Sequence, residues 1–155
     1  SLFLSFFYFI YIQIYQIGFG TPEYDEAVGL RYEVLRKPLG LDYSPEQLAS
    51  EYDQVHLAAY GNSGALLAYL NLTPAGTETV KMRQVAVATA LQGKGIGTLL
   101  VAESERLAQG LQFEVMSLHA RETAVPFYER LGYVREGERF EEVGIPHFKM
   151  KKALV

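Results

Sequence analysis

The clearest chemical signature in this sequence is the run Gln92-Gly93-Lys94-Gly95-Ile96-Gly97-Thr98, in which three glycines alternate with other residues. Glycine lets a backbone approach a ligand closely, and the N–H groups at the start of a helix attract an anion, helped by the helix dipole. Lys94 adds a mobile cation. The run predicts a site for an anionic group. The alternative is a tightly packed loop that binds no ligand.

Several other kinds of site are excluded by pattern. The P-loop requires G-x-x-x-x-G-K-[ST] and the dinucleotide fold requires G-x-G-x-x-G, whereas this run reads G-x-G-x-G. The chain has no cysteine, and its His, Asp and Glu residues lack the spacing of metal ligands. A G-x-S-x-G nucleophile motif is also missing. We therefore expect no metal and no cysteine or serine nucleophile.

A strand must lead into the glycine run and a helix must follow it. Residues 79–88 alternate as a strand does, and apolar residues then recur at helical spacing from Ile96 to Gly110. Another alternating strand is expected at 113–119. A strand–helix–strand unit of this kind implies a right-handed crossover between parallel strands.

The remaining elements complete a mixed α/β (α+β) fold in a single domain, residues 1–155. We expect an antiparallel meander, two early helices, one late helix and two final strands joined by a loop. The sheet should have six or seven strands and about four helices. In order, these elements are a helix at 22–36 capped by Thr21, a helix from Ser44 to about Tyr52, strands at 54–60, 65–72 and 79–88, a helix capped by Thr123 and ended by Gly132, and strands at 133–136 and 146–154.

The glycine run and a second block together resemble the GCN5-related N-acetyltransferase (GNAT) superfamily. Gln92, Gly95 and Gly97 occupy the fixed places of its [QR]-x-x-G-x-[GA] loop, which binds the pyrophosphate of acetyl-CoA. The second block, 124–133, reads A-V-P-F-Y-E-R-L-G-Y and is similar to the A-x-x-F-Y-x-x-x-G-[FY] helix. The G-I-P-H-F-K-M ending at 144–150 looks like one branch of the superfamily, and the resemblance covers roughly residues 10–152.

The resemblance implies how acetyl-CoA would be held. The backbone of Val85, Ala86 and Val87 would pair with the pantetheine arm like an extra strand, and one N–H there would polarise the thioester carbonyl. Backbone N–H groups of the loop would bind the pyrophosphate with help from Lys94; the loop residues are Gln92, Gly93, Lys94, Gly95, Ile96, Gly97 and Thr98.

The resemblance also implies catalytic roles. Tyr128 matches the family tyrosine near the cofactor sulfur, where a phenol can protonate the departing thiolate; a tyrosine that only packs in the core is the alternative. The family often has Asn where this chain has Arg121, which could pair with a cofactor phosphate or an acidic acceptor, or lie on the surface. For the general base the first candidate is His119, followed by Glu78, His56 and His147. The family's acceptor pocket corresponds to residues 31–46, whose mixed charges name no substrate.

The N-terminal segment is unusual because no charged residue occurs before Glu23. It lacks the basic start of a signal peptide, and glutamines interrupt the run that a membrane span would need. Alternation from Ile10 predicts a strand ending near Phe19. Residues 1–9 form an atypical apolar extension, and the sequence leaves open whether it belongs to the natural protein. The segment Leu2–Phe9 is apolar enough that we expect a second copy of the chain to cover it in a homodimer.

These observations favour a cytoplasmic N-acetyltransferase that moves an acetyl group from acetyl-CoA to a primary amine of a small molecule or peptide. The amine would attack directly in a ternary complex. The alternatives are a non-catalytic acyl-CoA-binding module of the same fold, a membrane-anchored or interaction protein that acts through residues 1–20, and an enzyme with a longer acyl donor. A net charge of −4 argues against nucleic-acid binding.

Overall fold

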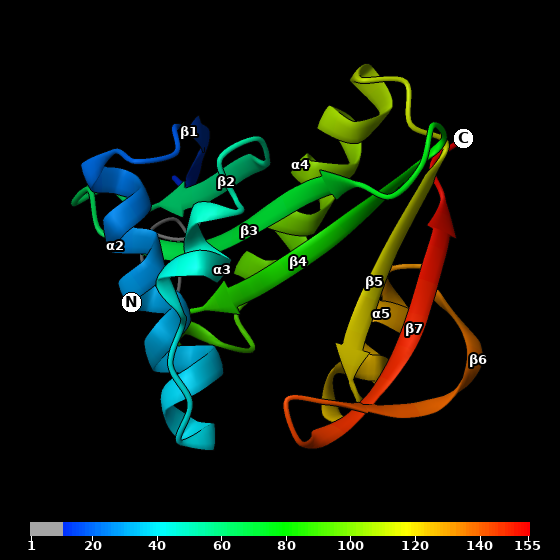
Figure 1. The fold of residues 1–155 in the computed structure, drawn as a ribbon. Coiled ribbons are helices and arrows are strands. Elements are labelled where there is room, and N and C mark those ends of the chain that lie inside the picture. The colour runs from blue at the N-terminus through cyan, green and yellow to red at the C-terminus, as the bar shows by residue number, and fades with distance from the viewer. Residues whose placement is uncertain (1–10) are drawn as a thin grey trace, which may run out of the picture. The chain divides into compact units, whose positions relative to one another are not determined.

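The structure, a computed structural model, describes residues 11–155. Within this range seven strands are hydrogen-bonded in the order β1-β2-β3-β4-β5-β7-β6 (Figure 1), and there are four α-helices. This confirms the expected mixed sheet. The strands are β1 (Gln13–Ile17), β2 (Val55–Tyr60), β3 (Leu66–Pro74), β4 (Thr79–Val87), β5 (Val115–Arg121), β6 (Val134–Glu142) and β7 (Ile145–Ala153), and the helices are α2 (Pro22–Arg31), α3 (Pro45–Ala49), α4 (Ile96–Gly110) and α5 (Val125–Arg130).

The chain divides into two compact units. The first runs through Asn71 and also includes Gln84–Glu103, and the second consists of Leu72–Arg83 and Ser104–Val155. The single domain expected from the sequence stays a prediction. The expected extension at residues 1–9 and the contact of Leu2–Phe9 with a second chain lie outside the described residues.

In the first unit, the helix starts follow local sequence signals. The Tyr24 N–H donates to the Thr21 hydroxyl oxygen at 3.2 Å, and the Gln47 N–H donates to the Ser44 hydroxyl oxygen at 3.1 Å, so both predicted caps are confirmed. The predicted helix 22–36 has the right extent, but its last part, Tyr32–Arg36, is a π-helical turn. Strand β1 ends at Ile17, before the predicted Phe19.

In the second unit, β4 and β5 pair in parallel, as predicted, from Thr79 with Val115 to Met82 with Leu118. Strand β5 begins and ends two residues later than expected. The physical reason is that Gln112 adopts a positive φ of 71°, which prolongs the turn after α4.

Two predictions for the second unit are wrong. Strand β6 extends to Glu142 and meets β7 through the two-residue turn Val143-Gly144, where a loop was expected. The Thr123 side chain does not cap α5, because Thr123 lies inside a 3₁₀ turn and the N-cap position falls on Ala124, which makes no side-chain cap bond.

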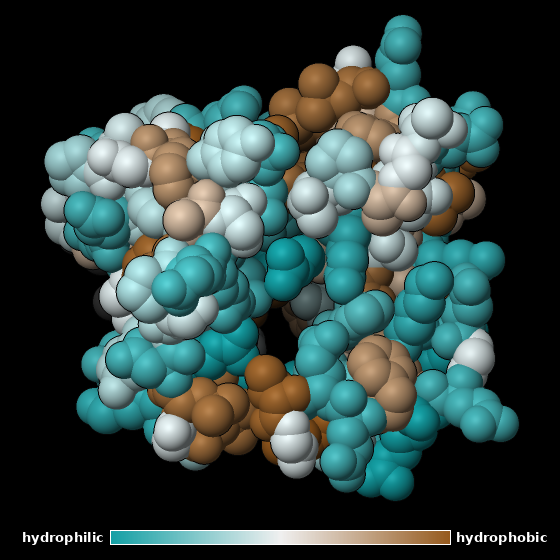
Figure 2. Space-filling model, viewed as in Figure 1, coloured by the Kyte–Doolittle hydropathy of each residue, from teal (hydrophilic) through white to brown (hydrophobic). Residues whose placement is uncertain are grey.

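The face of the molecule drawn in Figure 2 is mostly polar. Hydrophilic side chains cover most of its area, with a few separate apolar patches. Among residues 11–155 none of the helices combines the length and apolarity needed to cross a membrane.

Candidate functional site

The end of β4 is shaped by Gln84. This residue has a positive φ of 56°, a conformation that costs a residue with a side chain about 1–3 kcal/mol and turns the backbone out of a regular strand. The ladder between β4 and β5 ends at Met82, whereas β4 continues to Val87. The predicted arm-binding residues Val85, Ala86 and Val87 therefore follow an irregularity in the strand, and their role stays a prediction.

A buried tyrosine holds Gln84 in the first unit. The Tyr43 hydroxyl donates to the Gln84 side-chain oxygen at 2.6 Å, and the guanidinium carbons of Arg31 and Arg36 each lie 4.6 Å from the centre of the Tyr43 ring. Arg31 is fixed in turn by a bidentate pair with Glu51, with both N–O distances at 2.8 Å. Sequence reasoning missed this support, since it joins residues 41 positions apart.

The glycine run has the geometry of an anion-binding turn. Gly93 and Gly95 have φ values of 80° and 85°, and a Cβ built on either would meet nothing within 4 Å, so glycine is needed for conformation rather than for space. The first bond of α4 runs from the Leu99 N–H to the Gly95 carbonyl at 3.2 Å. The N–H groups of Ile96, Gly97 and Thr98 thus precede the helical ladder, and such groups fit phosphate oxygens.

Two other residues of the run hold the turn together. The Gln92 side-chain amide donates to the Val87 carbonyl at 3.1 Å, and its own N–H donates to the Thr89 carbonyl at 3.4 Å. The Ile96 side chain is 1% exposed and anchors the start of α4. The predicted pyrophosphate loop is therefore tied to the end of β4, within one unit.

Tyr128, the predicted acid, lies on α5 in the second unit. Its side chain is buried, with edge contacts to the Phe127 and Tyr133 rings at centroid distances of 5.0 Å and 5.7 Å. Burial raises the pKa of the Tyr128 phenol above its ordinary value, so it keeps its proton at neutral pH. The retained proton suits the proposed acid and the ring contacts suit a core tyrosine, so the catalytic role of Tyr128 stays a prediction.

The candidate base His119 lies in the second unit beside a carboxylate that sequence reasoning missed. Its Nδ1 is 2.9 Å from Glu142 Oε1 and 3.3 Å from Lys81 Nζ. Burial opposes the ionisation of Glu142, but the adjacent His119 outweighs this and lowers the pKa of Glu142 below its ordinary value. Burial, together with Arg83, lowers the pKa of Lys81.

The other candidate bases are distributed differently. His147 Nε2 lies 3.6 Å from Glu142 Oε2 and so joins His119 around one carboxylate. His56 is buried in the first unit, where its ring nitrogens contact the Tyr69 hydroxyl and the Glu51 carbonyl. Burial lowers the pKa of His56. Glu78 precedes β4, and Arg121 ends β5; the role predicted for Arg121 stays a prediction. Across residues 11–155 no cluster of three His, Asp or Glu residues could hold a metal ion.

Comparison with known proteins agrees with this geometry. A family model described as an acetyltransferase (GNAT) domain matches residues 30–154. A presumed acetyltransferase of Bacillus subtilis (strain 168) is 30% identical over 141 residues, which cover 85% of this chain and 92% of the relative.

Solved structures share the fold over nearly the whole chain. The crystal structure of a presumed N-acetyltransferase from Lactobacillus plantarum has a TM-score of 0.84 at 23% identity and covers 93% of this chain and 99% of its own. An aminoglycoside 6′-N-acetyltransferase crystallised with coenzyme A has a TM-score of 0.77 at 16% identity, covering 92% of this chain and 97% of its own. The match of the family model and the B. subtilis relative establish that this chain belongs to the GNAT family of acetyltransferases.

Proposed function

We propose that this protein transfers an acetyl group from acetyl-CoA to the nitrogen of a primary amine by direct attack in a ternary complex. The observation that carries the proposal is the turn at Gly93–Thr98. Its glycines have positive φ, and the N–H groups of the first helical turn precede the first helical hydrogen bond, which suits a diphosphate. The coenzyme A complex of a protein with this fold supports the choice of acyl donor.

The segment Val85–Val87 would hold the pantetheine arm through its backbone. Its N–H and C=O groups would pair with the amides of the arm, and one N–H would donate to the thioester oxygen as negative charge builds up on it. The backbone groups of this segment can pair with the arm only if the chain leaves regular strand geometry. The positive φ of Gln84 is such a departure and supports this role.

The reaction needs a proton removed and a proton supplied. His119 would take a proton from the amine's ammonium form, and the nitrogen lone pair would then attack the thioester carbon. As the C–N bond forms and the C–S bond breaks, Tyr128 would protonate the departing thiolate, for which its retained proton makes it available. The nitrogen would lose its second proton as the intermediate collapses, and that proton would restore the Tyr128 phenol, while the proton taken by His119 passes to water. The net products are an N-acetylated amine and free CoA.

Acetyl-CoA binding and thiol release together test the proposal. Calorimetry should show that Gly95→Ala weakens CoA binding about five- to thirtyfold, because alanine strains a left-handed backbone by about 1–2 kcal/mol. Gly64→Ala is the matched control, since Gly64 has φ 82°, equally open surroundings and a place in the turn after β2.

Thiol release should be followed over a panel of small amines and peptides with free amino termini. Release that depends on an amine supports the enzyme, and Tyr128→Phe should lower kcat. Binding of CoA without release for any amine would contradict the enzyme and indicate an acyl-CoA-binding module. The cytoplasmic location and the homodimer expected from the sequence stay predictions.

A further inference from the structure

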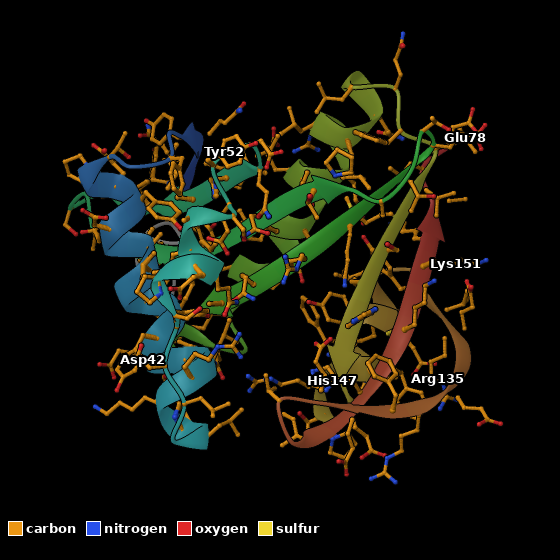
Figure 3. All side chains as sticks on the ribbon, in the orientation of Figure 1. Asp42, Tyr52, Glu78, Arg135, His147 and Lys151 are labelled. Atoms are coloured by element: carbon orange, nitrogen blue, oxygen red, sulfur yellow. The ribbon has the colours of Figure 1, made fainter. Side chains whose placement is uncertain are left out.

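Glu142 contacts two imidazoles with its two carboxylate oxygens. Oε1 is 2.9 Å from His119 Nδ1, and Oε2 is 3.6 Å from His147 Nε2. His147, labelled in Figure 3, is itself oriented, because its Nδ1–H donates to the Ile145 carbonyl at 2.9 Å, and a carbonyl can only accept. The Phe140 and His119 rings are nearly perpendicular to each other, with centroids 5.0 Å apart. Glu142 on β6 is therefore in contact with side chains from both β5 and β7.

The backbone on both sides of Glu142 departs from regular strand geometry. The next two residues, Val143 and Gly144, have φ values of 49° and 78°, the left-handed pair that a tight two-residue hairpin requires. A β-branched residue such as valine is rarely found there. A register shift between Glu136 and Phe140 also changes the pairing of β6 with β7 just before Glu142.

The neighbours of His119 favour opposite tautomers. A carboxylate only accepts hydrogen bonds, so a bond to Glu142 requires the proton on Nδ1 and leaves a lone pair on Nε2. An ammonium only donates, so a bond from Lys81 would require a bare Nδ1 and would place the proton on Nε2. The Glu142 contact at 2.9 Å is shorter than the Lys81 contact at 3.3 Å. The shorter contact favours the tautomer that the carboxylate requires.

We propose that Glu142 is the positioning residue that holds His119 with its proton on Nδ1, so that His119 Nε2 accepts the proton lost by the amine substrate. This rests on the proposed function. The ammonium would pass one proton to Nε2, leaving a neutral amine and an imidazolium that the ionised Glu142 stabilises. The imidazolium then returns its proton to water, and Glu142 keeps its charge throughout.

The direct test is the tautomer of His119 in solution. Two-bond proton–nitrogen NMR correlations at about pH 8.5, where an ordinary imidazole is neutral, distinguish the two forms. A His119→Gln spectrum assigns the signals. The proposal expects Nδ1–H in the wild type and in Lys81→Met. In Glu142→Ala, Lys81 is the neighbour that remains and it donates to Nδ1, so the Nε2–H tautomer should replace the Nδ1–H tautomer.

Two results would overturn the proposal: an Nε2–H tautomer in the wild type, or no change in Glu142→Ala. The Glu142 side chain is 45% exposed, so its removal should leave the fold intact, and the wild-type spectrum decides the point even without that variant. Glu141→Ala is the matched control, because it removes a carboxylate from the adjacent position of β6.

Kinetics provide the functional arm. With an amine from the panel, Glu142→Ala should lower kcat about ten- to a hundredfold, a part of the roughly hundred- to ten-thousandfold that general base catalysis contributes, and leave the KM for acetyl-CoA unchanged. Equal kcat values in Glu142→Ala and the wild type would refute a positioning role. If no amine is acetylated, the proposed function fails while the tautomer measurement still stands, so the two failures are distinguishable.

Discussion

Replacing Tyr43 by Phe isolates one hydrogen bond that we expect to shape the acetyl-CoA site. The hydroxyl donates to the Gln84 side chain at 2.6 Å, while the ring contacts the guanidinium groups of Arg31 and Arg36. Phenylalanine keeps the ring contacts and removes only the hydrogen bond. The change therefore acts on Gln84, the residue that precedes the proposed arm-binding segment Val85–Val87.

The size of the effect follows from two comparable free energies. A side-chain hydrogen bond contributes about 0.5–1.5 kcal/mol, and the positive φ of Gln84 costs about 1–3 kcal/mol. Without the hydrogen bond, Gln84 can relax toward an ordinary strand conformation, which coenzyme binding must then reverse. Since 1.4 kcal/mol is a factor of ten, CoA affinity should fall about two- to tenfold.

Calorimetric titration with CoA measures the affinity, and urea unfolding measures stability. The control is Tyr60→Phe, because the buried Tyr60 hydroxyl finds no hydrogen-bond partner within residues 11–155, and its removal should not weaken binding. A Tyr43→Phe protein that loses stability but binds CoA as the wild type does would show that this hydrogen bond only stabilises the fold. That outcome would refute the link between Gln84 and the arm.

Three further predictions concern stability. Arg31→Leu leaves Glu51 buried without its counterion and should lower the free energy of unfolding in urea by about 3–5 kcal/mol. Replacing both residues by Leu should cost less than this single change, and a cost of Arg31→Leu below about 1 kcal/mol would contradict the prediction. Stability should fall as the pH drops below about 6.5, because burial lowers the pKa of His56 and the unfolded chain takes up that proton first; His56→Gln should show a shallower fall, and equal slopes would count against it. Val143→Asn should raise the unfolding free energy by about 1 kcal/mol, because asparagine tolerates the left-handed conformation; a loss of stability would show that Val143 is not strained.

Features fixed by short stretches of chain were predictable. The hydroxyl caps at Thr21 and Ser44 need only the residues that follow them, and both form as expected. The helix from Ile96 to Gly110 follows from its apolar spacing. The glycine turn depends on φ values that glycine adopts easily, so its residue types indicate its shape.

Features that depend on distant parts of the chain were not predictable. Most of β6 is charged and exposed, so it lacks the alternation that marks a half-buried strand, and its Val-Gly turn lacks the usual Asn-Gly signal. The position of Glu142 was therefore hidden. Threonine is a residue type that often caps helices, but Thr123 lies inside the 3₁₀ turn that precedes α5, so the helix begins later than predicted. Nothing local indicates a positive φ at Gln84.

This difference has a chemical basis that bears on what the enzyme does. A diphosphate can be held by backbone N–H groups, whose directions follow from glycine and from a helix start, so a short motif is enough to specify the site. Proton transfer needs a side chain in one tautomer, which its neighbours in space determine. His119 acquires such neighbours only when β6 pairs with β7 and brings Glu142 to it, and when β4 brings Lys81 to it. The sequence motif thus predicts where acetyl-CoA would bind, whereas the proposed proton transfer depends on pairings that only the folded chain contains.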